Sequence, residues 1–264
     1  MQIVDLTDEH RPLFACCLED WSDEAAEAGP RRSCWIERFE ERGLRAKLCL
    51  DDEGRAGGMI QYLPIEESWA DGEGLYLVLC IWVHGHRQGR GNFQGRGMGR
   101  ALLAAAKADA RARGAKGMAC WGIALPFWMK ASWFRRQGYR RADRQGMSVL
   151  LWKPFTPDAR PPRWFPAGRR LPEPTPGKVD VTVFNAGWCM AGNLVAERAR
   201  RAAAEFGERV AYREIDTLER AVVVEWGHTD ALFVDDKRVR TGPPPSYEKI
   251  RSLIDRRMRK LPRG

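Results

Sequence analysis

The chain has 264 residues, of which 44% are hydrophobic and 30% charged, and its 44 Lys and Arg against 35 Asp and Glu give a net charge of +9. This length predicts one or two domains with a sizeable core, and this composition excludes a disordered tail protein. No segment approaches the roughly 18 uninterrupted apolar residues that a membrane helix needs. The acidic N-terminus lacks the basic and apolar stretches of a secretory signal, so we expect a cytoplasmic protein without a membrane partner.

The seven cysteines are scattered along the chain, and none of them forms a paired Cys-x-x-Cys cluster. An odd number of dispersed cysteines indicates neither a disulfide framework nor a structural zinc site. We therefore expect reduced thiols and no bound metal.

A proline-rich stretch divides the sequence. Eight of the sixteen prolines fall between Pro154 and Pro176, and such a composition favours an extended, semi-rigid connector over a helix or a central strand. The sequence therefore predicts a first domain over 1–153, a linker over 154–177 and a second domain over 178–264. The linker and the second domain carry +2 and +4 of the net charge.

The basic character is strongest near the C-terminus, around the single Asp255. The basic residues there are Lys249, Arg251, Arg256, Arg257, Arg259, Lys260 and Arg263. Such a run binds nucleic-acid phosphates in some proteins and forms a solvated helix face in others. No nucleic-acid fold signature accompanies it, so the solvated face is favoured and nucleic acid is not an expected partner.

The first domain reads as alternating helices and strands. Strands are predicted at 2–6, 44–50, 57–64, 75–83, 117–121 and 147–152, and helices at 8–21, around 34–39, and at 101–113 and 129–137. The run over 75–83 is almost continuously apolar, which is typical of a strand buried on both faces. The second domain reads as strands at 179–184, 209–215 and 231–234 with helices at 194–206 and 247–259. The fold class is α/β (α+β).

A Gly- and Arg-rich loop separates the strand at 75–83 from the helix at 101–113. Glycines at 95, 97 and 99 allow tight turns that bring backbone amides to a helix N-terminus, where the helix dipole favours an anion. Five basic residues surround the loop, and no acid occurs from 84 to 100: His86, Arg87, Arg90, Arg96 and Arg100. This pattern predicts binding of more than one phosphate. A flexible RNA-binding Gly/Arg loop is the alternative, which the flanking strand and helix disfavour.

The spacing Gln94-x-x-Gly97-x-Gly99 is neither a nucleotide P-loop nor a dinucleotide fingerprint. It resembles the pyrophosphate loop of the GNAT superfamily of N-acetyltransferases, as do the order of the elements and the Gly138-Tyr139 pair after the helix at 129–137. The segments 80–94 and 125–134 more narrowly resemble the YoaP-like acetyltransferases, in which a thioredoxin-like domain follows the transferase. This resemblance implies a mixed β-sheet flanked by helices over 1–153 and acetyl-CoA as the cofactor.

The resemblance also implies roles for individual residues. Main-chain groups of Ile81, Trp82 and Val83 would bind the thioester and the pantetheine arm, and the phenol of Tyr139 would protonate the departing thiolate. The amides that would hold the pyrophosphate belong to Gln94, Gly95, Arg96, Gly97, Met98, Gly99 and Arg100.

The family's usual positions for the general base correspond to Leu77 and Leu79, whose side chains cannot accept a proton. The candidates elsewhere are Glu66 and Glu67 acting through water, Glu73, His84 and His86. An exposed acidic turn is the favoured alternative for Glu66 and Glu67, and contact with phosphate is favoured for the two histidines.

Other side chains of the first domain have two interpretations. Cys80, beside the expected acetyl position, is a candidate for acylation, although a buried free cysteine is more often inert packing. Four tryptophans either line an acceptor channel or belong to the core: Trp69, Trp121, Trp128 and Trp133.

In the second domain, the strand at 179–184, the Trp188-Cys189 turn and the following helix resemble thioredoxin-like domains. Gly192 replaces the resolving cysteine, and Asp230 stands where the usual cis-proline is expected, so a dithiol cycle within this domain is excluded. The helix N-terminus favours the thiolate of Cys189, which makes it a candidate for binding a thiol ligand. A domain kept for dimerisation or substrate docking is the alternative.

Together these features predict an acetyl-CoA-dependent N-acetyltransferase that transfers the acetyl group directly to a small amine, including amines that carry a thiol. The alternatives are a CoA-binding, thiol-handling adaptor that uses Cys189, and an Arg-rich nucleic-acid binder. The expected partners are an amine acceptor, a thiol ligand at Cys189 and a second copy of the chain in a homodimer.

Overall fold

The chain forms two compact units. The computed structural model describes residues 1–125, 128–166, 170–240 and 242–261, so Pro126, Phe127 and Arg263 of the motifs above lie outside the described residues. The first unit comprises residues 1–21 and 36–165, and the second comprises 22–35 and 166–264. Residues 22–35, which the sequence analysis places in the first domain, thus group with the C-terminal part of the chain. Within the described ranges, no helix combines the length and the apolar character needed to cross a bilayer.

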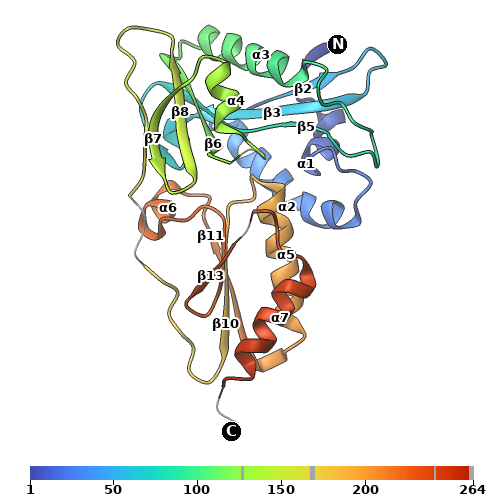
Figure 1. Ribbon diagram of the computed structural model, residues 1–264, viewed down its shortest axis with the longest axis vertical. Coiled ribbons are helices and arrows are strands. Elements are labelled where there is room, and N and C mark those ends of the chain that lie inside the picture. Colours follow the sequence, from blue (N-terminus) through green and yellow to red (C-terminus); the bar gives the residue numbers. More distant parts are fainter. Residues whose placement is uncertain (126–127, 167–169, 241, 262–264) are drawn as a thin grey trace. The chain divides into compact units, whose positions relative to one another are not determined.

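A seven-stranded mixed sheet forms the frame of the first unit (Figure 1). Its strand order is β1 (Gln2–Asp5), β2 (Arg45–Leu50), β3 (Ala56–Pro64), β5 (Leu75–Val83), β6 (Gly117–Ile123), β8 (Ser148–Pro154) and β7 (Arg140–Gln145). Neighbouring strands are antiparallel except β5 and β6, which are parallel. The expected α/β class, a large mixed sheet flanked by helices, is confirmed.

Two short or polar features of this unit were not predicted. Strand β7 has the polar sequence Arg-Arg-Ala-Asp-Arg-Gln and therefore shows no alternation of apolar residues. A separate two-stranded ladder joins β4 (Ala70–Asp71) to β9 (Arg163–Trp164), and two residues are too few to give a pattern. Figure 1 shows β7 and β8 steeply inclined to β3 and β5, so the sheet is strongly twisted.

Helices cover this sheet. α3 (Met98–Ala112) packs on β2, β3, β5 and β6 and buries an apolar face that includes Leu102, Leu103 and Ala106. α4 (Ala131–Arg136) packs on β6 and β8. The short helices η1 (Asp8–His10), α1 (Arg11–Ala15) and η2 (Ile65–Glu67) complete the unit. α3 begins three residues before the predicted start at 101, which places its N-terminus inside the glycine motif.

The helix predicted over 8–21 ends at Ala15 instead. Cys17 and Leu18 have φ angles of 59° and 65°, a left-handed conformation that a helix cannot contain. The side chain of Leu18 is completely buried, and its amide donates to the carbonyl of Leu13 at 3.0 Å. Burial of this leucine offsets the strain of the turn. The residues that follow, up to Trp21, thereby leave the helix and reach the end of β5.

The second unit has a four-stranded sheet of order β11 (Val210–Asp216), β10 (Val179–Asn185), β12 (Ala231–Val234) and β13 (Lys237–Val239). β10 and β11 are parallel, and the other pairs are antiparallel. α5 (Met190–Ala204) and α7 (Tyr247–Met258) pack against each other and on β10 (Figure 1). η3 (Gly207–Arg209) and α6 (Arg220–Trp226) complete the unit, and its core lies between these two helices and the strands.

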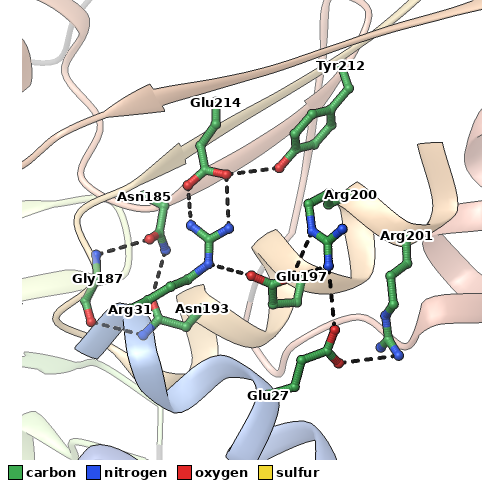
Figure 2. A network of polar contacts seen from close by, with 10 residues as sticks. All are labelled: Glu27, Arg31, Asn185, Gly187, Asn193, Glu197, Arg200, Arg201, Tyr212 and Glu214. Atoms are coloured by element: carbon green, nitrogen blue, oxygen red, sulfur yellow. Dashed lines mark hydrogen bonds and ion pairs between the residues drawn. The ribbon is translucent and has the colours of Figure 1, made fainter. Parts of the chain in front are cut away.

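Ion pairs attach residues 22–35 to this second unit. They form most of α2 (Asp23–Glu40), and the boundary between the units falls inside this helix, after Trp35. The Arg31 guanidinium binds Glu197 at 2.7 Å and also Glu214, whose carboxylate accepts a hydrogen bond from the Tyr212 hydroxyl (Figure 2). These glutamates are 166 and 183 positions away in sequence, so no local pattern could have predicted the contact.

Two further carboxylates of α2 bind arginines of α5. Glu24 binds Arg198 and Arg201, and Glu27 binds Arg200 and Arg201 (Figure 2 shows the Glu27 pairs). The acidic face of this part of α2 thus matches a basic face of α5. Three arginines of α5 thus form ion pairs within the second unit.

Candidate functional site

The loop before α3 has an open helix N-terminus. Gly95 and Gly97 have φ angles of 81° and 86°, which other residues adopt only under strain. Gly97 is the N-cap of α3, and no described side chain caps the helix. Because the Arg100 amide already donates to Gly97 at 3.0 Å, the amides of Met98 and Gly99 are the donors of the first turn that have no backbone acceptor among the described residues. A Cβ atom at residue 95 or 97 would meet nothing within 4 Å, so the space beside these two glycines is open.

The charges around the loop divide into two groups. Arg96 and Arg100 are exposed and have no acidic partner among the described residues, and the Arg96 guanidinium lies 5.2 Å from the centre of the Phe93 ring. Arg90, in contrast, binds Asp20 at 2.9 Å. An acidic residue from outside the loop thus pairs with part of the basic cluster. The sequence from 84 to 100, which contains no acid, gives no sign of this pairing. The two free arginines flank the open helix N-terminus.

Buried contacts hold the preceding part of the loop. His84 is completely buried, its Nδ1 lies 2.7 Å from the Gly91 carbonyl, and its Nε2 lies 3.5 Å from the indole nitrogen of Trp21. The Phe93 amide donates to the His84 carbonyl at 2.9 Å, and the Phe93 ring is buried. Both ring nitrogens of His84 are therefore engaged, and this histidine closes the loop over 85–92 rather than facing a ligand.

Gln94 extends from this loop back to the strand. Its side-chain amide lies 3.4 Å from the Val83 carbonyl, and its own backbone amide donates to the Asn92 side chain at 2.9 Å. Gln94 thus ties the glycine turn to the end of β5.

The strand β5 changes its pairing at its centre. It is bonded to its parallel neighbour β6 only as far as the pair Val78 and Cys120, although both strands continue beyond it. On the other edge, the register with β3 shifts so that Leu79 is an extra residue between the pairs of Val78 and Cys80. The bulge reverses the alternation of side chains, so that Ile81 and Val83 join the core under α3. Residues 81–83 therefore present one main-chain edge that pairs with no strand in the part of the chain that the structure describes.

Tryptophans lie where β5 and β6 separate. The Trp121 indole donates to the Leu79 carbonyl at 2.7 Å and satisfies a main-chain group that the bulge leaves unpaired. The Trp121 and Trp128 rings make an edge contact with centres 5.3 Å apart, and Trp133 approaches Gly99 on α3. All three pack against the core cluster under α3.

Tyr139 lies in the same core cluster. It is 3% exposed, and its hydroxyl has no hydrogen-bond partner within the described part of the chain. Burial raises the pKa of the phenol well above its usual value, so this group keeps its proton. Cys80 is also buried, and the side chains of Cys80 and Trp82 leave β5 on the face opposite Ile81.

Glu66 and Glu67 lie at the other end of β5. The Glu66 carboxylate accepts the Gly74 amide at 2.6 Å, immediately before β5 begins, and Glu67 lies 3.7 Å from Arg42. The eight steps from Leu75 to Val83 cover about 26 Å at the usual rise of a strand. The structure therefore does not bring these two carboxylates to the glycine loop.

A carboxylate that the sequence analysis did not consider lies at the loop end. Glu19 follows the short helix α1, and its carboxylate lies 3.7 Å from His86 Nε2. Burial raises the pKa of Glu19, and the charges of His86 and His84 oppose this shift. The His86 ring lies 6.1 Å from that of Trp82, whose indole nitrogen is buried and has no partner among the described residues. The left-handed turn at Cys17 and Leu18 delivers Glu19 to this place, and no motif signals it.

The turn that carries Cys189 in the second unit is built differently. A buried network joins Asn185, Gly187 and Asn193: the Asn185 side chain accepts from the Gly187 amide at 3.1 Å and donates to Asn193 at 3.0 Å (Figure 2). Asn193 in turn donates to the Gly187 carbonyl at 2.9 Å. Cys189 is the N-cap of α5 and is partly exposed.

Asp230 occupies the space next to Gly192 in the first turn of α5. A Cβ atom at residue 192 would lie 2.6 Å from Asp230 Oδ1, an oxygen that is buried and has no partner among the described residues. Burial raises the pKa of the Asp230 carboxyl to about 7, against the opposing effects of the Trp188 indole and the Ala186 amide. The two residues that replace the expected cysteine and proline are thus in direct contact, and the carboxyl fills the volume that a side chain at 192 would need.

No protein-family model matches this chain, and no curated protein matches it. Similar solved structures include a GNAT family N-acetyltransferase from Escherichia coli in complex with CoA, with 15% identity and a TM-score of 0.44, covering 62% of this chain and 88% of that chain. The PaiA N-acetyltransferase from Thermoplasma acidophilum with CoA has 14% identity and a TM-score of 0.44, covering 59% and 100%. A GNAT family acetyltransferase from Brucella melitensis with acetyl-CoA has 18% identity and a TM-score of 0.40, covering 60% and 90%. At these identities and TM-scores, the similarities assign no activity to this chain.

Proposed function

We propose that the chain is an acyl-CoA-dependent N-acyltransferase, with acetyl-CoA as the donor and a small amine as the acceptor. The observation that carries this proposal is the β5–α3 turn. An uncapped helix N-terminus with two free amides follows a strand that has separated from its parallel neighbour. This combination offers an anion site and an open main-chain edge next to each other.

The residues of this turn fit the donor. The amides of Met98 and Gly99 and the free charges of Arg96 and Arg100 would hold the pyrophosphate. The open main-chain edge of residues 81–83 would bind the pantetheine arm. When bound, acetyl-CoA supplies an activated acyl group as a thioester.

Proton removal from the amine would fall to the Glu19–His86 pair. Glu19 is half-buried, and desolvation raises the pKa of its carboxyl, which makes the carboxylate a stronger proton acceptor than an exposed one. The indole N–H of Trp82 beside it, which has no partner among the described residues, would donate a hydrogen bond to an acceptor atom of the substrate. We therefore propose Glu19 and His86 as the base in place of Glu66 and Glu67.

Tyr139 stays a proposed proton donor to the thiolate. Its raised pKa keeps the phenol protonated, and its hydroxyl lacks a partner among the described residues. A role for Cys80 by acylation is not part of the proposal, because its side chain is buried.

A binding experiment with matched variants tests the donor site. Acetyl-CoA at a hundredfold excess over its Kd should stabilise the full chain by about 2.7 kcal/mol, measured as a rise in Tm. Gly97→Glu places a carboxylate at the free amides and should abolish this rise. Gly114→Glu is the control, because Gly114 also has a left-handed φ, of 78°, and open surroundings at the other end of α3. Equal stabilisation of all three proteins would contradict the proposal.

Release of free CoA in the presence of amines then separates an enzyme from a thiol-handling adaptor. Glu19→Gln should lower kcat at least tenfold, as loss of a general base does, while the rise in Tm with acetyl-CoA persists. Binding without CoA release from any amine, together with a mass adduct that Cys189→Ser removes, would favour the adaptor that uses Cys189.

A further inference from the structure

The second unit contains a cavity that the proposed acyl transfer does not use. It lies between the β12–β13 hairpin and α7 and has a volume of about 470 Å³. This volume falls in the range of about 300–1,000 Å³ that is usual for small-molecule sites. Val239, Leu253 and Pro245 contribute apolar surface to its wall.

The lining of this cavity is strongly basic. Seven of its eleven lining residues are Lys or Arg, and no carboxylate lines it among the residues that the structure describes. One of the seven, Arg257, is neutralised by Asp235 at 3.3 Å and Asp236 at 3.0 Å. The other six have no ion-pair partner in the described part of the chain: Lys237, Arg238, Arg240, Lys249, Arg256 and Lys260.

Helix α7 sorts the basic run at the C-terminus into two sets. Lys249 and Arg256 are seven residues apart, which places them on one face of the helix, and Lys260 lies in the turn just after it; all three line the cavity. Arg251 and Arg259 do not line it, and they bind Glu205 and Asp255 instead. Opposite the cavity, Ile250, Ile254 and Met258 are buried in the core. The basic run is therefore not a uniform solvated face.

Concentrated positive charge without counter-charge is costly unless an anion binds. Desolvation lowers the pKa of Arg238, and no carboxylate offsets this shift. A ligand with several phosphate groups would supply enough negative charge for these six cations. An apolar or aromatic part of the same ligand would contact the valine and leucine side chains of the wall. An extended nucleic acid is less suited, because the cations converge on one cavity of limited volume.

We propose that this cavity binds a small organic polyphosphate. The site is independent of the glycine loop, since all of its residues belong to the second unit. Its ligand would be held mainly by charge, so its affinity would fall steeply with salt.

Calorimetric titration of the full chain at low salt tests this site, with ATP and inorganic pyrophosphate as probes. All titrations use the Gly97→Glu background, which removes binding at the α3 N-terminus and makes the result independent of the proposed acyl transfer. The double variant Lys249→Gln/Arg256→Gln should weaken ATP at least tenfold. Arg259→Gln is the matched control on the same helix and should change the affinity less than twofold, because its exposed side chain lies outside the cavity.

Three outcomes would overturn the proposal. The first is absence of binding by either probe in the Gly97→Glu background. The second is equal weakening in the double variant and the Arg259→Gln control, which would indicate non-specific attraction by net charge. The third is a single-stranded oligonucleotide that binds more tightly with each added nucleotide while ATP does not compete, which would identify a nucleic-acid surface. Intact near-ultraviolet circular dichroism of the double variant excludes misfolding as the cause of a loss.

Discussion

Two strand-to-helix turns of this molecule have the same local structure, but one leaves the space beside its glycines open and the other fills it. In both the β5–α3 turn and the β10–α5 turn, a buried strand leads to a helix whose N-cap provides no side-chain hydrogen bond. Around Gly95 and Gly97 nothing lies within 4 Å of an added Cβ, whereas at Gly192 the Asp230 carboxyl already occupies that space. A helix N-terminus after a strand can therefore take up an external anion only where the protein leaves the volume empty. In the second turn the protein supplies its own carboxyl group.

The pH dependence of the second unit should show the largest effect. The pKa of Asp230, about 7 in the folded protein, exceeds the value of about 3.9 in an unfolded chain, so the folded state binds the proton more tightly. The resulting stabilisation is fully present below about pH 4 and is lost as the pH rises to about 7. It amounts to at most about 4 kcal/mol. Urea unfolding of the wild type and of Asp230→Asn at pH 5 and pH 8 should show that only the wild type loses this stability. Parallel pH profiles would mean that the carboxyl is ionised in the folded turn.

Adding one methyl group at each turn should separate the filled turn from the open one. We expect Gly192→Ala to be destabilising in the wild type and not in an Asp230→Ala background, with a coupling free energy of about 1–2 kcal/mol. Gly95→Ala should cost about 1–2 kcal/mol through its left-handed φ alone, with no coupling to Asp230. A double-mutant cycle by thermal unfolding measures both. Additive effects at Gly192 and Asp230 would show that the carboxyl moves away freely.

The smallest expected effect concerns the strand before the open turn. Trp121→Phe removes the donor to the Leu79 carbonyl and leaves this main-chain group unpaired, at a cost of about 1 kcal/mol or more. If the bulge positions residues 81–83, the variant should also raise the KM for acetyl-CoA more than it lowers kcat. Leu63→Val, at a buried position of β3, provides the control for a loss of stability without a change at the bulge. An unchanged KM would separate the bulge from donor binding.

Local patterns in the sequence determined much of the first unit. The apolar run over 75–83 and the glycines at 95, 97 and 99 predicted a buried strand and a helix N-terminus, because strand burial and left-handed turns depend on nearby residues. Both elements are present, and so are the strand at 231–234 and the C-terminal helix. The polar strand β7 and the left-handed turn at Cys17 and Leu18 were not predicted. Strand pairing and burial by residues distant in sequence determine these two features.

Tertiary structure decided which charges act together. Part of the basic run before the C-terminus lines a cavity because α7 places Lys249, Arg256 and Arg257 beside the β12–β13 hairpin. Glu19 contacts His86, which is 67 positions away in sequence, and Arg31 contacts Glu197, which is 166 positions away. The Asp230 side chain fills the space beside Gly192. Electrostatic attraction and steric exclusion act through space, so a linear pattern specifies the groups that a site contains but not the neighbours that complete or occupy it.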